Sequence, residues 1–379
     1  MYKYGGKGGG CLWGYRSCSD LQRKIVALFT HCLLNFDSTF FCCVWVDFCL
    51  TFLYIRLPTC LHTYIATHNS KQQQQHCYIA TMAFPPYTGY AFTGLDSLHA
   101  DIYPAISAAQ TPSLKQPGKA VLVTGASRGI GRAIAIQYAH ANVATIILAA
   151  RSADKLEEVK KEIEGVNGEV KVLVKAVDVT SVESVQALGK EVEGEVGRLD
   201  VLVNNAGAAG AWVPLAESKP EDWWWDYEVS VKAPYLFMHA LLPLMVKTAE
   251  KHGGKADIIN MTSVGAHAFI PGASAYHTCK LASLRLSEFV KVEYGDKGII
   301  CVGMHPGGVQ TQIAEGKTQL EGYLNDTPEL AAGFTVWLTA ENREWLSGRY
   351  VAAPWDVEKL ESMKEEIVDG DKLLVRMVV

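Results

Sequence analysis

From Lys119 onward, two kinds of hydrophobic pattern alternate along the chain. Short apolar runs, typical of buried strands, alternate with longer segments that have the periodicity of helices. Strands are predicted at 120–123, 144–149, 170–177, 199–203, 257–261, 298–303 and 349–352. Helices are predicted at 128–140, 154–164, 181–193, 220–250, 274–294 and 328–338, with Ser181 and Ser184 as candidate caps of the third.

This order of elements predicts an α/β fold. Strands that alternate with helices form βαβ units, and right-handed crossovers wind these units into a parallel sheet with helices on both faces. We therefore expect a single Rossmann-type domain over residues 118–379. In such a doubly wound sheet the ligand binds at the carboxyl ends of the strands.

The first part of the chain has a different character. Residues 1–81 open rich in glycine, run apolar from Ile25 to Leu57 and hold no helical or strand period. Residues 38–55 are long enough for a membrane helix, but Asp47 lies in their middle, where a carboxylate costs about 2.5–3.5 kcal/mol. We interpret residues 1–81 as a non-homologous extension translated from sequence that is not normally coding. The alternatives are a poorly ordered tail and a single membrane anchor.

The stretch that leads into the regular pattern is rich in proline. Residues 82–117 hold five prolines and no sustained period. We expect an irregular arm there.

Charge and cysteine content narrow the class of protein. The formal net charge of −5 gives no reason to expect a nucleic acid or an anionic membrane as partner. Eight of the ten cysteines precede Met82, whereas an oxidised secreted protein spreads cysteine pairs through its core. We expect a cytoplasmic protein, or a membrane-anchored one if residues 38–55 insert. No metal site is predicted.

A glycine-rich turn joins the first predicted strand to the first predicted helix. It reads Thr124-Gly-Ala-Ser-Arg-Gly-Ile-Gly131. Glycines there allow a tight turn and a close approach of the backbone to a pyrophosphate, and the helix N-terminus favours the anion. An ordinary loop is the alternative for the glycines alone. The expected cofactor contacts are Thr124, Gly125, Ser127, Arg128, Gly129, Ile130 and Gly131.

The second predicted strand indicates which dinucleotide binds. A site for NAD needs an acidic residue about twenty positions after the glycines, to bind the ribose hydroxyls. That place holds Ala150 and Arg151, and Arg151, together with Arg128, could pair with a 2′-phosphate. NADP(H) is therefore favoured over NAD(H), unless both arginines are only solvated surface residues. Asp178 is a candidate contact for the adenine amino group, or a helix cap.

The strongest chemical pattern is a tyrosine and a lysine four residues apart. Tyr276 and Lys280 lie in a predicted helix, so the phenol and the ammonium share one face. A tyrosine is a poor base at neutral pH, and a nearby lysine cation with a positive nicotinamide lowers its pKa. Ser263, at the end of the fifth strand, can hydrogen-bond a substrate carbonyl. For the pair alone, a half-buried tyrosine beside an exposed lysine is the alternative.

Together these motifs resemble the short-chain dehydrogenase/reductase family from about Lys119 to Ala352. The glycine turn, Asn204-Asn-Ala-Gly207, Ser263, Tyr276-x-x-x-Lys280 and Pro306-Gly-Gly-Val-Gln-Thr311 occur in the family's order. The resemblance implies an NAD(P)(H)-dependent oxidoreductase with a small carbonyl or alcohol substrate, Tyr276 as general acid/base, and a homo-oligomer. It also implies cofactor contacts from Asn205, Ala206, Gly207, Tyr276, Lys280, Pro306, Gly307, Val309 and Thr311.

The chain departs from the family pattern at Ser230. The family carries an asparagine in a Val-Asn-Val context, where this chain reads Val229-Ser-Val231. That asparagine helps to hold a water molecule in the proton relay to the lysine. Ser230 keeps the backbone carbonyl but shortens the side chain, so we count it with the catalytic residues and question the efficiency of the relay. A protein that binds NADP(H) without catalysis, as a sensor or scaffold, is therefore the rival function.

Three segments are expected to form the substrate pocket: the loop around Trp212 to Trp225, residues 266–275, and the flap after Thr311. Trp212 and the run Trp223-Trp-Trp225 suit an apolar or ring-bearing substrate. Three consecutive tryptophans cannot share one helix face, so at least one is expected to pack elsewhere.

Overall fold

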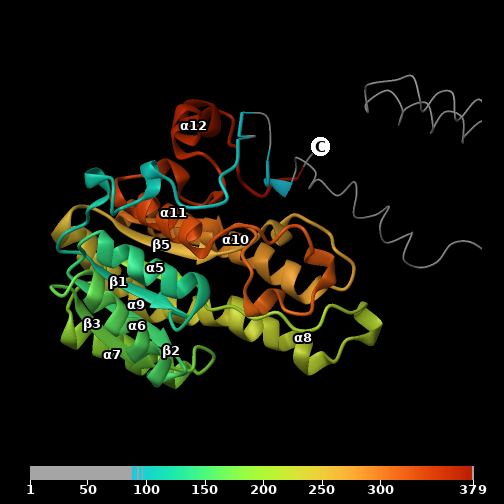
Figure 1. The fold of residues 1–379 in the computed structure, drawn as a ribbon, viewed down its shortest axis with the longest axis horizontal. Coiled ribbons are helices and arrows are strands. Elements are labelled where there is room, and N and C mark those ends of the chain that lie inside the picture. Colours follow the sequence, from blue (N-terminus) through green and yellow to red (C-terminus); the bar gives the residue numbers. More distant parts are fainter. Residues whose placement is uncertain (1–87, 92–93, 96, 378–379) are drawn as a thin grey trace, which may run out of the picture. The chain divides into compact units, whose positions relative to one another are not determined.

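A parallel sheet of seven strands forms the centre of the part of the chain that the computed structural model describes, residues 88–91, 94–95 and 97–377 (Figure 1). The strands are β1 (Ala120–Thr124), β2 (Thr145–Ala150), β3 (Lys171–Ala176), β4 (Val201–Asn204), β5 (Ala256–Met261), β6 (Ile299–His305) and β7 (Tyr350–Ala352). Their spatial order is β3-β2-β1-β4-β5-β6-β7, and each neighbouring pair is parallel. The predicted Rossmann-type α/β fold is confirmed. The extension and anchor expected within residues 1–81 lie outside the described residues.

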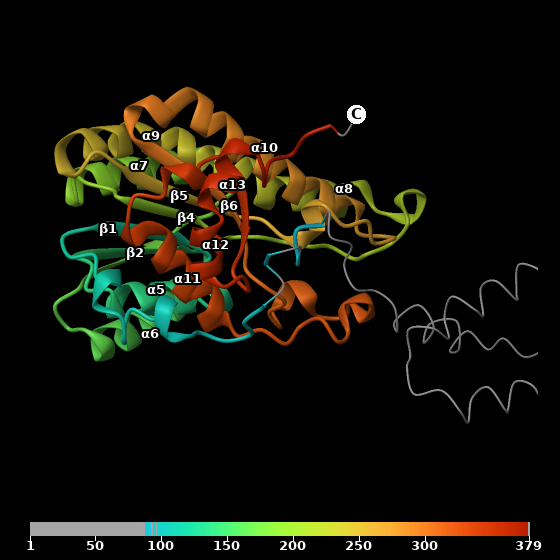
Figure 2. The same ribbon diagram turned by 90° about the horizontal axis from the view of Figure 1, so that it is seen from above.

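Helices cover both faces of the sheet, as Figure 2 shows. One face carries α5 (Gly129–His140), α6 (Ala153–Val166) and α11 (Pro328–Ala340), and the other carries α7 (Val182–Glu195), α9 (Ala233–His252) and α10 (Ser274–Tyr294). The central strands are buried on both sides and therefore read as continuous apolar runs. Alternate residues of β1 separate the two cores: Val121 and Val123 face one, and Leu122 faces the other.

The long predicted helix 220–250 contains a wider turn. It begins as α8 (Pro220–Tyr227), passes through a π-helical segment, η5 (Glu228–Lys232), and continues as α9. Among the described residues, the run 220–252 is the one helix long and apolar enough to cross a membrane, yet most of its apolar stretch is buried inside the domain. It is a core helix, and the π turn places Ser230 next to α10.

The proline-rich arm is irregular, as expected, but it is also part of the core. Two short turns, η2 (Pro104–Ile106) and η3 (Pro112–Leu114), bury Ile106 and Leu114. The Trp355 indole nitrogen donates to the Tyr90 carbonyl at 3.1 Å, which ties the arm to the chain after β7. The sequence pattern gave no indication of this packing, because such short turns have no period to detect.

Several other short elements were not predicted. The C-terminal helices α12 (Val357–Ser362) and α13 (Lys364–Asp369) span six residues each, too few for a helical period to stand out. The remaining 3₁₀ turns are η4 (Leu215–Glu217), η6 (Val264–Ala266), η7 (Gly295–Lys297), η8 (Gln312–Ala314), η9 (Thr318–Leu320) and η10 (Glu344–Leu346).

Candidate active site

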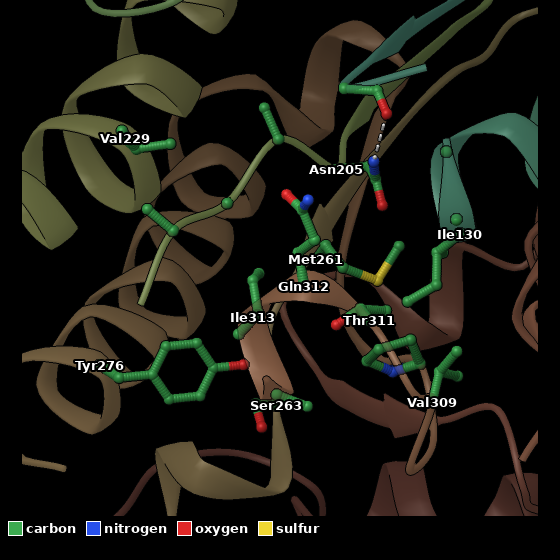
Figure 3. A pocket seen from close by; sticks show the side chains of 18 of the residues that line it. Ile130, Asn205, Val229, Met261, Ser263, Tyr276, Val309, Thr311, Gln312 and Ile313 are labelled. Carbon is green, nitrogen blue, oxygen red and sulfur yellow. Dashed lines mark hydrogen bonds between the residues drawn. The ribbon is translucent and has the colours of Figure 1, made fainter. Parts of the chain in front are cut away.

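A cavity of about 620 Å³ opens at the carboxyl ends of the central strands (Figure 3). It collects every predicted site residue except Thr124 and Ser230. Those that line it are Gly125, Ser127, Arg128, Gly129, Ile130, Gly131, Arg151, Asp178, Asn205, Ala206, Gly207, Ser263, Tyr276, Lys280, Pro306, Gly307, Val309 and Thr311.

Thr124 lies behind the lining and joins two strand ends. Its hydroxyl oxygen accepts the backbone N–H groups of Asn205 and Ala206, each at 3.0 Å. The Asn205 amide returns a hydrogen bond to the Thr124 carbonyl at 2.9 Å. These contacts hold the end of β4 against the end of β1, so the glycine turn and the Asn205-Ala206-Gly207 segment form one wall.

The glycine turn has the geometry of a pyrophosphate cradle. Gly125 and Gly129 have positive φ angles of 65° and 53°, a region that favours glycine. A Cβ atom on Gly131 would lie 2.3 Å from the Gly125 carbonyl oxygen, so no larger residue fits there. The turn opens α5, whose first N–H groups are free to bind an anion. These residues therefore fit a dinucleotide.

One end of the cavity is basic. Arg128, Arg151 and Lys155 line it, with Ala150 at the end of β2. Among the described residues, no salt bridge ties any of these three cations to a carboxylate. Lys155 was missed by the sequence analysis, although its place in the first turn of the helix after β2 could have pointed to it.

Asp178 lies near the same end and holds its own loop. Its Oδ1 atom accepts the backbone N–H of Thr180 at 2.9 Å and the Thr180 hydroxyl at 2.7 Å. These hydrogen bonds, with the nearby Arg151 charge, lower the pKa of Asp178. The cap of α7 is Ser181, as predicted, because its hydroxyl accepts the Ser184 N–H at 3.1 Å. The alternative that Asp178 caps this helix is therefore wrong.

Ser263, Tyr276 and Lys280 meet at the other end of the cavity. Figure 3 shows the Tyr276 hydroxyl pointing toward Ser263, and the Ser263 side chain acts to lower the pKa of Tyr276. The Ser263 oxygen also accepts the Gly265 N–H at 3.0 Å, which fixes its position. Lys280 is only 4% exposed, and its Nζ atom donates to the Met261 carbonyl at 3.0 Å and lies 5.4 Å from the centre of the Tyr276 ring. The alternative with an exposed lysine is therefore wrong.

Burial governs the charges of this pair. It lowers the pKa of Lys280 to about 8, and it raises the pKa of Tyr276 more than the Ser263 hydrogen bond lowers it. Sequence reasoning expected the lysine, together with a positive nicotinamide, to lower the tyrosine pKa. In the protein alone, desolvation by burial has the largest effect and raises the tyrosine pKa. The phenol is therefore protonated at neutral pH.

Ser230 lies behind the lining, in the π-helical turn. It is buried, and its backbone carbonyl accepts the Ser283 hydroxyl of α10 at 3.1 Å. A π turn leaves carbonyls without their usual helical partner and is frequent at functional sites. Here the Ser283 hydroxyl donates to the Ser230 carbonyl. The sequence pattern did not reveal this contact.

The tryptophans divide between cavity and packing, as the sequence predicts. Trp212 and Trp225 line the cavity. Trp223 donates from its indole nitrogen to the Ser274 hydroxyl at 3.1 Å, and its ring stacks on Tyr227. Trp224 is 60% exposed.

Several further residues that line the cavity were not named from the sequence. The cavity is also lined by Tyr90, Ile270, His277, His305, Ile313, Leu320, Tyr323 and Leu324. His305 ends β6, so the rule that ligands gather at strand ends could have found it. Tyr90 belongs to the arm, and nothing in the sequence indicated that the arm reaches the site. Within the described residues, no group of His, Cys, Asp and Glu could hold a metal ion.

This combination defines the class of protein. A parallel sheet, a glycine turn at the point where strand order reverses, and a tyrosine–lysine pair at the same cavity are the parts of an oxidoreductase that uses a nicotinamide dinucleotide. Residues 119–322 match the short chain dehydrogenase family, and the chain belongs to that family. The predicted family is thus confirmed, and the protein is an NAD(P)-dependent oxidoreductase.

Individual relatives agree with this assignment. The chain is 46% identical over 302 residues to short chain dehydrogenase mpl6 of Monascus purpureus, covering 79% of this chain and 100% of the relative. It is 38% identical over 291 residues to short chain dehydrogenase pigC of Monascus ruber, covering 74% and 93%. Among solved structures, a metagenomic short-chain oxidoreductase in complex with NADP is similar, with a TM-score of 0.51, 29% identity and coverage of 61% and 93%.

Proposed function

We propose that this protein transfers a hydride between NADP(H) and a carbonyl/secondary alcohol pair, with Tyr276 as the general acid/base. The observation that carries the proposal is that Ser263, Tyr276 and Lys280 line the same cavity as the glycine turn. This arrangement brings a proton donor to the cavity that the cofactor cradle opens into.

Preference for NADP(H) rests on the basic end of the cavity. Three cations without salt-bridge partners among the described residues surround the place where an acidic residue would bind the ribose of NAD. A 2′-phosphate suits such a group, because charge-assisted hydrogen bonds to arginine are strong. A solved relative, the metagenomic oxidoreductase, is itself a complex with NADP.

The side chains supply position and a proton. When bound, NADPH provides the hydride. Ser263 and Tyr276 hydrogen-bond the substrate carbonyl oxygen as negative charge grows on it, and Tyr276 donates its proton to that oxygen. Lys280 has three N–H donors and uses one on Met261, so the other two remain for the ribose hydroxyls and for proton return to Tyr276.

Burial favours the protonated form of Tyr276, which is the form that carbonyl reduction uses. Burial raises the pKa of Tyr276, so the phenol holds its proton until a substrate oxygen takes it. Alcohol oxidation requires the phenolate instead, and the same burial disfavours that form.

The setting of the enzyme is also a proposal. Cys279 and Cys301 are buried free thiols, which suits the reducing cytoplasm. The helix α10 exposes Leu281, Phe289 and Val292, and an exposed apolar face of this kind favours a homo-oligomer. Sedimentation velocity would measure that state directly.

A panel of ketones, aldehydes and alcohols, each tested with NADPH or NADP⁺ and with NADH or NAD⁺, tests the proposal. We expect nicotinamide absorbance to change with at least one carbonyl compound, and faster with NADPH than with NADH. Tight NADPH binding without turnover of any compound would favour the non-catalytic sensor or scaffold instead.

A further inference from the structure

A buried histidine in the cavity, His305, has no hydrogen-bond partner among the described residues for either ring nitrogen. His305 is 4% exposed, and within the described part of the chain neither Nδ1 nor Nε2 makes a hydrogen bond. A buried polar group without a partner is costly, and most such groups in native proteins are satisfied by protein, water or ligand. His305 also lines the cavity, so its missing partner can come from whatever the cavity binds.

The position of His305 puts it close to Ser263 at the edge of the sheet where the cavity opens. It is the last residue of β6, and its carbonyl accepts the Ala353 N–H at 2.9 Å, so its backbone is fixed. In the neighbouring strand register, the Thr262 N–H donates to the Met304 carbonyl at 2.8 Å. Because Met261 is paired with Met304, His305 lies beside Thr262, one residue before Ser263, at the same edge of the sheet.

The surroundings of the ring are aromatic rather than charged. The Tyr90 ring centre lies 6.2 Å away, and His267 is a further neighbour. Burial, with a smaller contribution from His267, lowers the pKa of His305 to about 3. The imidazole is therefore neutral at physiological pH and presents one N–H donor and one acceptor nitrogen.

We propose that His305 is a specificity-determining residue that binds a hydroxyl group carried by the substrate on a ring next to the reacting carbonyl. This inference rests on the proposed reductase function. A hydroxyl is both donor and acceptor, so it can satisfy either imidazole nitrogen. The aromatic side chains Tyr90, Trp212 and Tyr276 line the same cavity and suit a flat ring. The substrate class is therefore a hydroxylated ring aldehyde or ketone.

Benzaldehyde and its meta- and para-hydroxy derivatives test this subsite. We would measure kcat/KM with NADPH, and Kd by calorimetry on the enzyme saturated with NADP⁺. In the native protein, one hydroxy isomer is expected to exceed benzaldehyde by about tenfold. His305→Phe should bring that ratio close to one without weakening NADPH, and His305→Gln, which keeps a donor and an acceptor, should restore part of it.

Tyr350→Phe is the matched control. The Tyr350 hydroxyl is also buried without a partner in the described residues, but Tyr350 is not among the cavity residues, so the ratio should not change. An unaltered ratio in His305→Phe would overturn the proposal and assign the imidazole to a buried water. Weaker NADPH binding in that variant would assign it to the cofactor. The proposed function fails only if no carbonyl compound of the wider panel is turned over, and the Kd ratios of the three aldehydes decide the role of His305 in either case.

Discussion

Lys280 shows how burial sets the chemistry of single side chains at this site. Its folded pKa is about 8, below the value of 10.5 for a free lysine, because the ammonium is desolvated. Reduction requires the proton on Tyr276 and the charge on Lys280. Since the pKa of Tyr276 is raised, Lys280 is the first of the two to lose its proton as pH increases.

We therefore predict that the rate of carbonyl reduction is level at neutral pH and falls as pH rises through about 8. The measurement is kcat with NADPH across pH at saturating substrate. Lys280→Arg is the informative comparison, because a guanidinium stays charged and should remove the fall in whatever activity remains. A native profile that stays level well above pH 8 would show that Lys280 does not titrate as its burial indicates.

Arg151 is another single side chain with a predicted effect, because we expect it to determine the preference for NADPH over NADH. Arg151→Ala should weaken the binding of NADPH by about 1.5–3 kcal/mol, as expected for a lost charge-assisted hydrogen bond. The same change should barely affect the binding of NADH. Fluorescence titration of both cofactors measures this. Lys160→Ala is a suitable control, because Lys160 lies on the same helix as Lys155, is paired with Glu157 at 3.8 Å and does not line the cavity. Equal losses for the two cofactors would make Arg151 structural.

At the level of elements, the regular parts of the fold could be predicted and the irregular parts could not. The strand at 120–123 and the helix at 274–294 stood out because continuous burial or helical periodicity marks each of them. The π turn at Ser230 could not be recognised in the sequence, because one wider turn hardly alters the spacing of apolar residues. The candidate site followed from motifs at strand ends, whereas Tyr90 enters it through contacts distant in sequence.

The arm provides a prediction at this scale. Ile106 is fully buried, and its carbonyl lies so close to Gly333 that a Cβ atom there would be 2.8 Å away. Ile106→Ala should therefore lower the free energy of unfolding by about 2–4 kcal/mol, the usual cost of a core truncation. Urea unfolding measures it, with Leu98→Ala in the same arm, at a side chain 36% exposed, as the control. If both variants lowered the free energy of unfolding by the same small amount, the arm would not be part of the core.

For the whole molecule, the arm and the Rossmann-type sheet should behave as one folding unit. A chain that starts at Met82 keeps the described arm and all the predicted cofactor residues, so it should be soluble and bind NADPH as the full chain does. A chain that starts at Pro117 removes the buried Ile106 and Leu114 and should aggregate or unfold. Calorimetry measures NADPH binding by the chain that starts at Met82. Loss of that binding would show that residues 1–81 are integral to the domain.

In the proposed mechanism, Tyr276 donates the proton during hydride transfer from NADPH. Tyr276→Phe removes only the hydroxyl, so the most direct measurement compares NADPH oxidation by this variant and by the native protein on the best carbonyl substrate of the panel. We predict that the variant binds NADPH with unchanged affinity and loses turnover, while Ser263→Ala keeps more activity and loses roughly a hundredfold, as for one oxyanion donor. A Tyr276→Phe protein with native turnover would contradict the mechanism.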